Sequence, residues 1–248
     1  MNSVIQKLIF NVGALIFLPF LIVLAFFARM FTRREQDLRL VWGSTAIINY
    51  SHWSKAMKQA GFKSETLVVD YYKVINDRSD WDRVLNEEYI GTPASIKKIF
   101  AFVHSLYIYD VFFISCDGFL IGNSPLRFFQ AFLFKLAAKK IVVLPYGSDG
   151  NVYKNIRSPN SLHGLLLSYP DYAKQQDRIE KNIMYWVKNA DAFIPGFMGI
   201  DGFGRWDVLI PNTLSLDLNE WQSSQRKNSN NGRNGRVVVA HAPNHRGF

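Results

Sequence analysis

The chain has 248 residues, of which 48% are hydrophobic and 20% charged. This apolar content is enough for a complete core, so composition excludes an intrinsically disordered protein. Lys and Arg outnumber Asp and Glu by 29 to 20, giving a net charge of +9. No zinc spacing, helix-turn-helix pattern or RNA-binding aromatic strand accompanies this charge, so we expect no nucleic-acid partner. The single cysteine, Cys116, fits a reducing compartment.

Residues 8–28 form a segment without charged side chains in which Leu, Ile, Phe and Val dominate. As a helix it would cover roughly 30 Å, the thickness of a bilayer's hydrocarbon core. The competing interpretation is a cleaved signal peptide. The apolar stretch is longer than the ~7–15 residues of a signal-peptide apolar region, and no small-residue cleavage motif precedes Arg29. The sequence therefore favours an uncleaved membrane anchor at residues 1–34.

Basic residues are distributed unevenly around this predicted anchor. Lys7 stands alone before it, whereas four arginines follow it: Arg29, Arg33, Arg34 and Arg39. Positive residues stay on the cytoplasmic side, so we expect the globular part to face the cytoplasm. The prediction is a single-pass protein of the inner (cytoplasmic) membrane, and the basic flank also favours contact with anionic headgroups.

After the anchor, apolar runs and helix-periodic segments alternate along the chain. Strands are expected at residues 38–44, 64–70, 110–115, 139–144, 191–195 and 206–211. Helices are expected at residues 49–60, 94–106, 125–138 and 170–189. Residues 71–91 have no clear pattern. Such alternation predicts an α/β fold with a Rossmann-like parallel sheet flanked by helices, preceded by one transmembrane helix.

The end of the chain has a different composition. Residues 222–235 are Ser, Asn, Gly, Lys and Arg with almost nothing apolar, which is typical of a linker. Residues 237–239 then form a β-branched run suited to a buried strand. We therefore expect one complete domain at residues 36–221, a linker, and at residues 236–248 the first strand and loop of a truncated donor-binding domain.

Polar residues gather where the predicted strands end, the edge at which open parallel sheets bind ligands. Gly43 and Ser44 end the first strand and precede a helix, so their backbone N–H groups are candidates for phosphate or acceptor binding. The alternative is an ordinary strand-to-helix turn, since no G-x-G-x-x-G or G-x-x-x-x-G-K-[ST] motif is present.

Asp149 is the leading catalytic candidate. It can act as a general base or accept a hydrogen bond from a sugar hydroxyl, with Tyr146 and Ser148 beside it on the same strand end. The alternative is a structural turn closed by the Asp149 side chain, with neighbouring glycines supplying backbone freedom. Asp117, which follows the strand at residues 110–115, has the same two interpretations.

The remaining reactive side chains indicate no metal or nucleophile. The five histidines lack the spacing of a zinc site, so no metal and no cofactor are expected. Cys116 has no basic partner in the sequence and fits a small buried residue better than a nucleophile.

Three stretches carry a family resemblance: residues 43–50, 144–149 and 239–248. With them, residues 38–248 resemble the amino-terminal half of a GT-B glycosyltransferase, most like the family 4 retaining enzymes of bacterial surface-polysaccharide synthesis. Many relatives place a histidine where this chain has the segment Tyr146 to Asp149. The paired glutamates that hold the donor in this family would lie in the second domain.

The resemblance implies a membrane-anchored hexosyltransferase-type enzyme. Its substrates would be a nucleotide-sugar donor and a lipid-linked or polysaccharide acceptor. Arg246 matches the basic residue that contacts the donor diphosphate in the family, a role that suits a bidentate guanidinium. The alternative is a non-catalytic, membrane-bound sugar- or nucleotide-binding subunit that needs a partner for its second half.

Overall fold

The computed structural model describes residues 16–32, 37–195 and 204–208. The chain divides into two units at residues 215 and 216, and every described residue belongs to the first. The predicted linker at residues 222–235, the predicted strand at residues 236–248 and Arg246 therefore lie outside the described residues.

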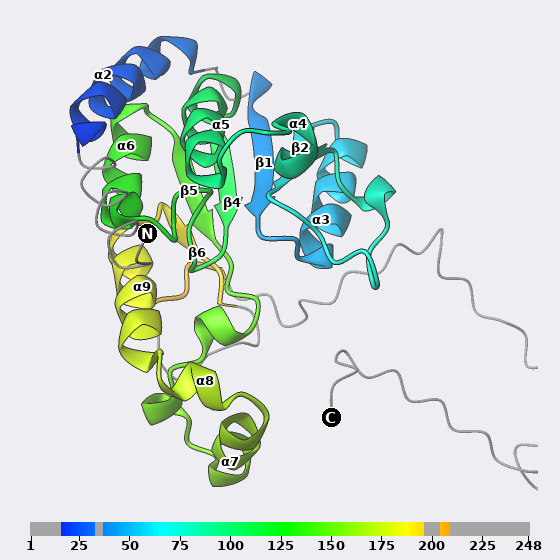
Figure 1. The fold of residues 1–248 in the computed structure, drawn as a ribbon, viewed down its shortest axis with the longest axis vertical. Helices are drawn as coiled ribbons and strands as arrows, with labels where there is room; N and C mark the ends of the chain where they lie inside the picture. Colours follow the sequence, from blue (N-terminus) through cyan, green and yellow to red (C-terminus); the bar gives the residue numbers. More distant parts are fainter. Residues whose placement is uncertain (1–15, 33–36, 196–203, 209–248) are drawn as a thin grey trace, which may run out of the picture. The chain divides into compact units, whose positions relative to one another are not determined.

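A parallel six-stranded sheet forms the centre of the described unit (Figure 1). Its strands, in chain order, are β1 Arg39–Ser44, β2 Lys63–Val68, β3 Arg83–Val84, β4 Val111–Ile114, β5 Lys140–Val143 and β6 Ala192–Phe193. Their order across the sheet is β3-β2-β1-β4-β5-β6. The strand order thus reverses between β1 and β4, as in dinucleotide-binding folds. The predicted Rossmann-like α/β sheet is confirmed.

Helices connect the strands on both sides of that reversal. The α-helices are α2 Leu18–Ala28, α3 Ile48–Gln59, α4 Leu85–Glu88, α5 Ala94–Ile108, α6 Gln130–Leu136, α7 Pro159–Ser168, α8 Pro170–Ala173 and α9 Gln176–Asn189. The 3-10 helices are η1 Arg29–Phe31, η3 Arg78–Asp80, η4 Pro125–Phe129, η5 Ser148–Gly150 and η6 Tyr153–Asn155. The helices predicted at residues 49–60 and 94–106 correspond to α3 and α5 within two residues.

Three predicted elements differ from the structure. The helix predicted at residues 170–189 is two helices, α8 and α9, and the second begins where the Gln176 side chain accepts a hydrogen bond from the Tyr153 backbone N–H (2.7 Å). The helix predicted from Pro125 begins as the 3-10 helix η4. Residues 206–208 of the predicted last strand form no strand, although Asp207 N–H donates to the Phe193 carbonyl beside β6.

The core lies on both faces of the sheet because successive side chains of a strand point to opposite sides. On one face, Phe112 of β4 packs against Phe134 of α6, with ring centroids 4.6 Å apart. On the other face, Phe113 stacks on Trp42 of β1 at 3.8 Å, and Tyr50 of α3 joins this cluster. Coverage of both faces explains why the central strands β4 and β5 are almost continuously apolar.

Helix α2 lies beside α5 and α6 in Figure 1 and packs against both. It buries Leu21, Ala25 and Ala28, and the Tyr107 hydroxyl of α5 donates to the Leu24 carbonyl at 2.9 Å. No helix in the described part of the chain has both the length and the apolar character needed to cross a bilayer. Residues 8–15 of the predicted anchor lie outside the described residues.

A buried ion pair lies at the opposite edge of the sheet from the candidate loops. Lys139 Nζ is 3.2 Å from Asp110 Oδ1, and the two side chains are 0% and 1% exposed. The other carboxylate oxygen of Asp110 accepts the Arg39 backbone N–H at 3.1 Å. Lys139 Nζ also donates to Thr32 Oγ1, after α2. The pair therefore links the starts of β1, β4 and β5 to the N-terminal helix.

Replacing Asp110 with alanine should destabilise the protein by about 3–5 kcal/mol, because the Lys139 ammonium would stay buried without its counter-ion. The matched control is Asp37→Ala, which removes an exposed partner of Lys63 (side chains 60% and 69% exposed) and should cost less than about 1 kcal/mol. Denaturant unfolding measures both. Equal losses in the two variants would contradict the proposed importance of the buried pair.

Candidate functional site

The loops after β1 and β4 lie next to each other where the strand order reverses. In open α/β sheets this position is the usual ligand crevice. Here it holds a cavity of about 430 Å³. Its lining includes Ser44 and Thr45 after β1, Asp117 and Gly118 after β4, and Lys98 of α5.

A second cavity of about 620 Å³ lies beside the first and shares two lining residues with it, Asp117 and Asn123. Its other polar lining residues come from η4, the segment after β5, and the region from the end of α7 to α9: Arg127, Tyr146, Asp149, Ser168, Tyr169, Asp171, Tyr172, Gln175 and Arg178. Both cavities have a size suited to small ligands. Asp117 is therefore the carboxylate that both can present to a ligand.

Asp149 is held firmly by backbone groups. Its Oδ1 accepts the N–H groups of Tyr146 and Gly147, both at 3.0 Å, and its Oδ2 accepts the Cys116 N–H at 2.9 Å. The residue is 5% exposed. Burial raises the pKa of Asp149 to about 7, the charge of Asp117 adds to the rise, and the three backbone N–H groups oppose it. Asp149 thus joins the loops after β4 and β5.

These bonds bear on the two interpretations of Asp149. The bonds from Tyr146 and Gly147 are the local turn contacts that the structural alternative expects. The bond to Cys116 is not local in sequence, and Asp149 still lines the second cavity. Its catalytic role stays a prediction, and its part in fixing the loop is a direct observation.

Asp117 is more open than Asp149 and lies at the junction of the cavities. The Tyr146 hydroxyl donates to Asp117 Oδ2 at 3.4 Å. Burial raises the pKa of Asp117, while the positive charge of Arg178 and the Tyr146 bond lower it. A carboxylate with a raised pKa beside a phenol hydroxyl can accept a proton or a hydrogen bond from a ligand hydroxyl.

Gly43 and Ser44 occupy different environments. Ser44 lines the first cavity, and its Oγ accepts the Leu120 N–H at 2.9 Å, which ties the β1 loop to the β4 loop. Gly43 lies inside β1, where an added Cβ would come 1.9 Å from the Leu67 carbonyl oxygen of β2. The neighbouring strand therefore explains the glycine, and its predicted ligand contact stays a prediction. The Ser148 side chain is outside the described part of the chain.

Three basic residues of the cavities were not among the sequence candidates: Lys98, Arg127 and Arg178. Burial, with the neighbouring charge of Lys97, lowers the pKa of Lys98. Helical periodicity indicated which residues share a face but not which helix end would approach the strand loops. All three lie within the first five residues of their helices, α5, η4 and α9.

The remaining reactive groups behave as small structural residues. Cys116 is buried, and burial with the charges of Asp149 and Asp117 raises the pKa of its thiol well above the ordinary value. A thiol held in this form is a poor nucleophile. Within the described residues, no group of three His, Cys, Asp or Glu side chains is arranged to hold a metal ion.

Comparison of the chain with models of protein families, with curated proteins and with solved structures gives no match. The resemblance to the GT-B glycosyltransferases therefore stays a prediction from the sequence. The two cavities and the side chains that line them are the structural basis for a functional proposal.

Gly43→Ala should destabilise the protein by about 2 kcal/mol or more, because the new methyl group must displace the β2 backbone. Gly164→Ala is the matched control: an added Cβ in α7 meets nothing within 4 Å, and alanine should stabilise this helix by up to about 1 kcal/mol. Thermal or denaturant unfolding gives both values. A Gly43→Ala variant as stable as the wild type would show that β1 and β2 can separate locally.

Asp149 should make stability fall as the pH rises. Its pKa is 3.8 ordinarily and about 7 in the folded protein, so between these values the unfolded chain releases a proton that the folded chain keeps. The wild type should therefore lose up to about 4 kcal/mol from pH 4 to pH 7. Asp149→Asn should lack this loss. Unfolding free energies measured across that range test the difference, and parallel profiles for the two proteins would refute it.

Proposed function

We propose that this protein is a glycosyltransferase whose described domain binds the acceptor, and that it transfers a sugar from a nucleotide-sugar donor to a lipid-linked or polysaccharide acceptor. The main support is the position of Asp117, which lines both cavities where the strand order of the sheet reverses. Hydroxyl-rich ligands need such convergent carboxylate, phenol and amide groups. Tyr146 supplies the phenol group and Asn123 the amide group.

In this proposal Asp117 accepts the proton of the attacking acceptor hydroxyl. Its raised pKa supports the role, because a base titrating closer to neutrality is a better proton acceptor. Asp149 is then a positioning residue, since its oxygens already accept three backbone N–H groups. This assignment departs from the sequence prediction, in which Asp149 was the catalytic residue.

The donor side of the reaction belongs to the second, donor-binding domain expected from the sequence. Arg246 would neutralise the diphosphate leaving group there, so protein cations would replace a metal ion in this role. Ser44 and the backbone at Gly43 would contact the acceptor or its phosphate. The membrane anchor predicted at residues 1–34 is part of the same proposal and would hold a cytoplasmic enzyme at the inner membrane beside its acceptor.

The test combines turnover with binding. Nucleotide release is measured for the full chain with UDP-, GDP- and dTDP-sugars as donors and alkyl glycosides as acceptor probes. Asp117→Asn should lower turnover by about 100-fold or more, because the base is lost while the side chain keeps its size. Tyr146→Phe should lower it by about tenfold through loss of one hydrogen bond. Asp177→Asn, an exposed carboxylate of α9, should change neither value.

Binding of the same probes by calorimetry separates the alternatives. Wild-type binding that depends on Asp117 but is never followed by nucleotide release would favour the non-catalytic binding subunit. Turnover that survives Asp117→Asn would overturn the assignment of the base. Absence of both binding and turnover with every probe would overturn the proposed function.

A further inference from the structure

Helix α2 is apolar on all sides. Its eleven residues, Leu18–Ala28, contain no polar side chain. A helix on the surface of a water-soluble domain normally has a polar outer face. Here Leu21, Ala25 and Ala28 face the core, and the outward positions are large apolar residues that stay about half exposed: Phe20, Val23, Phe26 and Phe27.

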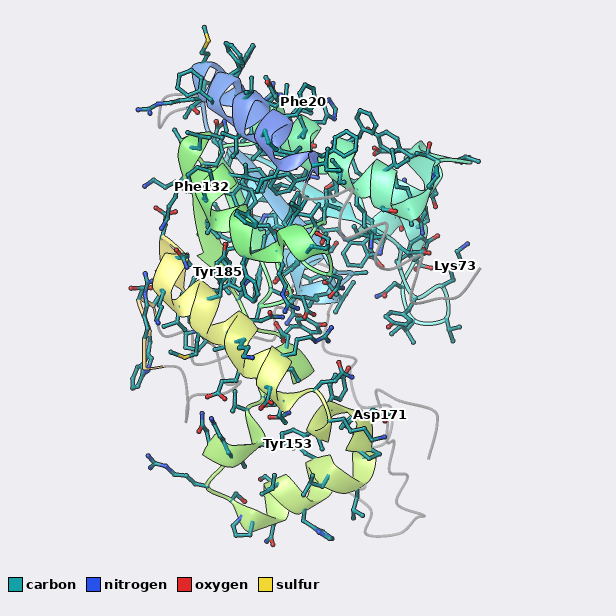
Figure 2. All side chains as sticks on the ribbon, turned by 60° about the vertical axis from the view of Figure 1, so that its left-hand side comes forward. Phe20, Lys73, Phe132, Tyr153, Asp171 and Tyr185 are labelled. Atoms are coloured by element: carbon teal, nitrogen blue, oxygen red, sulfur yellow. The ribbon has the colours of Figure 1, made fainter. Side chains whose placement is uncertain are left out.

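The apolar surface continues onto the two helices that hold α2. On α5, Tyr107 binds the Leu24 carbonyl, and Phe100 lies two helical turns earlier on the same face, 63% exposed. On α6, Phe132 is 49% exposed. Figure 2 brings this side of the molecule forward and labels Phe20 and Phe132 on it. We call the exposed parts of Phe20, Val23, Phe26, Phe27, Phe100 and Phe132 the apolar face.

The helices that carry or adjoin the apolar face have charged side chains of one sign. Helices α2, η1, α5, η4 and α6 contain no Asp or Glu. They contain five basic residues: Arg29, Lys97, Lys98, Arg127 and Lys135. A surface that combines exposed apolar side chains with basic ones, of which Lys97 is buried, matches the interface of a bilayer that contains anionic lipid.

The same charges argue against a second copy of the chain as the occupant. A symmetric dimer brings two copies of the same patch together, so the basic residues of these helices would meet basic residues and no acidic partner from the same helices. The length of α2 argues against a simple crossing by this helix, because eleven residues cover only about 16 Å. Its tight packing on α5 and α6 also keeps it beside the domain.

We propose that the apolar face inserts shallowly into a bilayer containing anionic lipid, so that the domain itself lies on the membrane. Residues 18–28 enter this docking as α2, packed along the domain, and the docking requires no segment that crosses the bilayer. It also bears on the acceptor: each cavity takes a basic lining residue from an element that carries or adjoins the apolar face, Lys98 from α5 and Arg127 from η4, immediately before α6. If the proposed glycosyl transfer is correct, this proximity favours a lipid-linked acceptor.

The experiment places an environment-sensitive fluorophore on the full chain at Phe132→Cys. Cys116 is buried, so the introduced thiol is the one that reacts. The control is Phe62→Cys, at an exposed phenylalanine between α3 and β2. With vesicles of equal parts phosphatidylcholine and phosphatidylglycerol, the label at 132 should shift to the blue and be quenched by lipids brominated in their acyl chains. The label at 62 should show neither effect.

A second readout uses vesicle co-sedimentation. Phe100→Ser combined with Phe132→Ser should weaken partitioning by about tenfold or more, because two half-exposed rings lose their apolar contact. Pure phosphatidylcholine should weaken wild-type partitioning by at least about tenfold, because the basic residues lose their counter-charges. Phe62→Ser should bind as the wild type does.

Three outcomes would overturn the proposal. One is vesicle binding with an unchanged label at 132, which would mean that only the N-terminal segment contacts lipid. The second is absence of vesicle binding. The third is a blue shift that needs no lipid and grows with protein concentration, which would identify a second copy as the occupant. No readout uses a sugar substrate, so failure here and failure of the proposed transferase activity are distinguishable.

Discussion

The buried pair of Asp110 and Lys139 is the constraint on which the arrangement of the domain depends. Two charges removed from water are costly unless their geometry is fixed and their remaining polar atoms are satisfied. Here the carboxylate also accepts the Arg39 N–H, and the ammonium also donates to Thr32. The pair therefore tolerates one alignment of β1, β4 and β5 and one position for the segment after α2. Because the strands are parallel, fixing their starts also fixes where their opposite ends meet.

A second carboxylate acts similarly at those opposite ends. Asp149 accepts the Cys116 N–H after β4 and two N–H groups of its own loop after β5. Side-chain hydrogen bonds therefore hold both ends of β4: Asp110 accepts one before the strand, and the Cys116 N–H donates one after it. Asp117 is the residue after Cys116. The Asp117 carboxylate therefore lines both cavities from a loop that these hydrogen bonds hold in place. If Asp117 is the proton acceptor that we propose, this preorganisation lowers the cost of reaching a reactive geometry.

Much of this fold was predictable from local pattern, and much of the site was not. The apolar run before Cys116 and the helical spacing from residue 94 fixed β4 and α5, because burial on both sides of a parallel sheet leaves a strong periodic signal. The break between α8 and α9 was not predicted, because it involves a hydrogen bond from the Tyr153 backbone N–H to the side chain of Gln176, 23 residues later. Asp117 and Asp149 were both found as strand-end carboxylates. The different exposure of these two carboxylates depends on tertiary packing, which residue spacing does not encode. The same holds for the positions of Lys98 and Arg178 at the cavities.

The sheet of the described unit ends in two very short strands. Both β3 and β6 have two residues. Beside β6, Asp207 donates its N–H to the Phe193 carbonyl and accepts the Phe193 N–H on its carboxylate at 2.7 Å, so the free side of that strand is already occupied. A long unpaired strand invites another chain to extend the sheet and aggregate. On a membrane, the docking that we propose would bring copies of the protein together often. The two-residue edge strands, and the bonds of Asp207 beside β6, leave little free backbone through which such copies could pair.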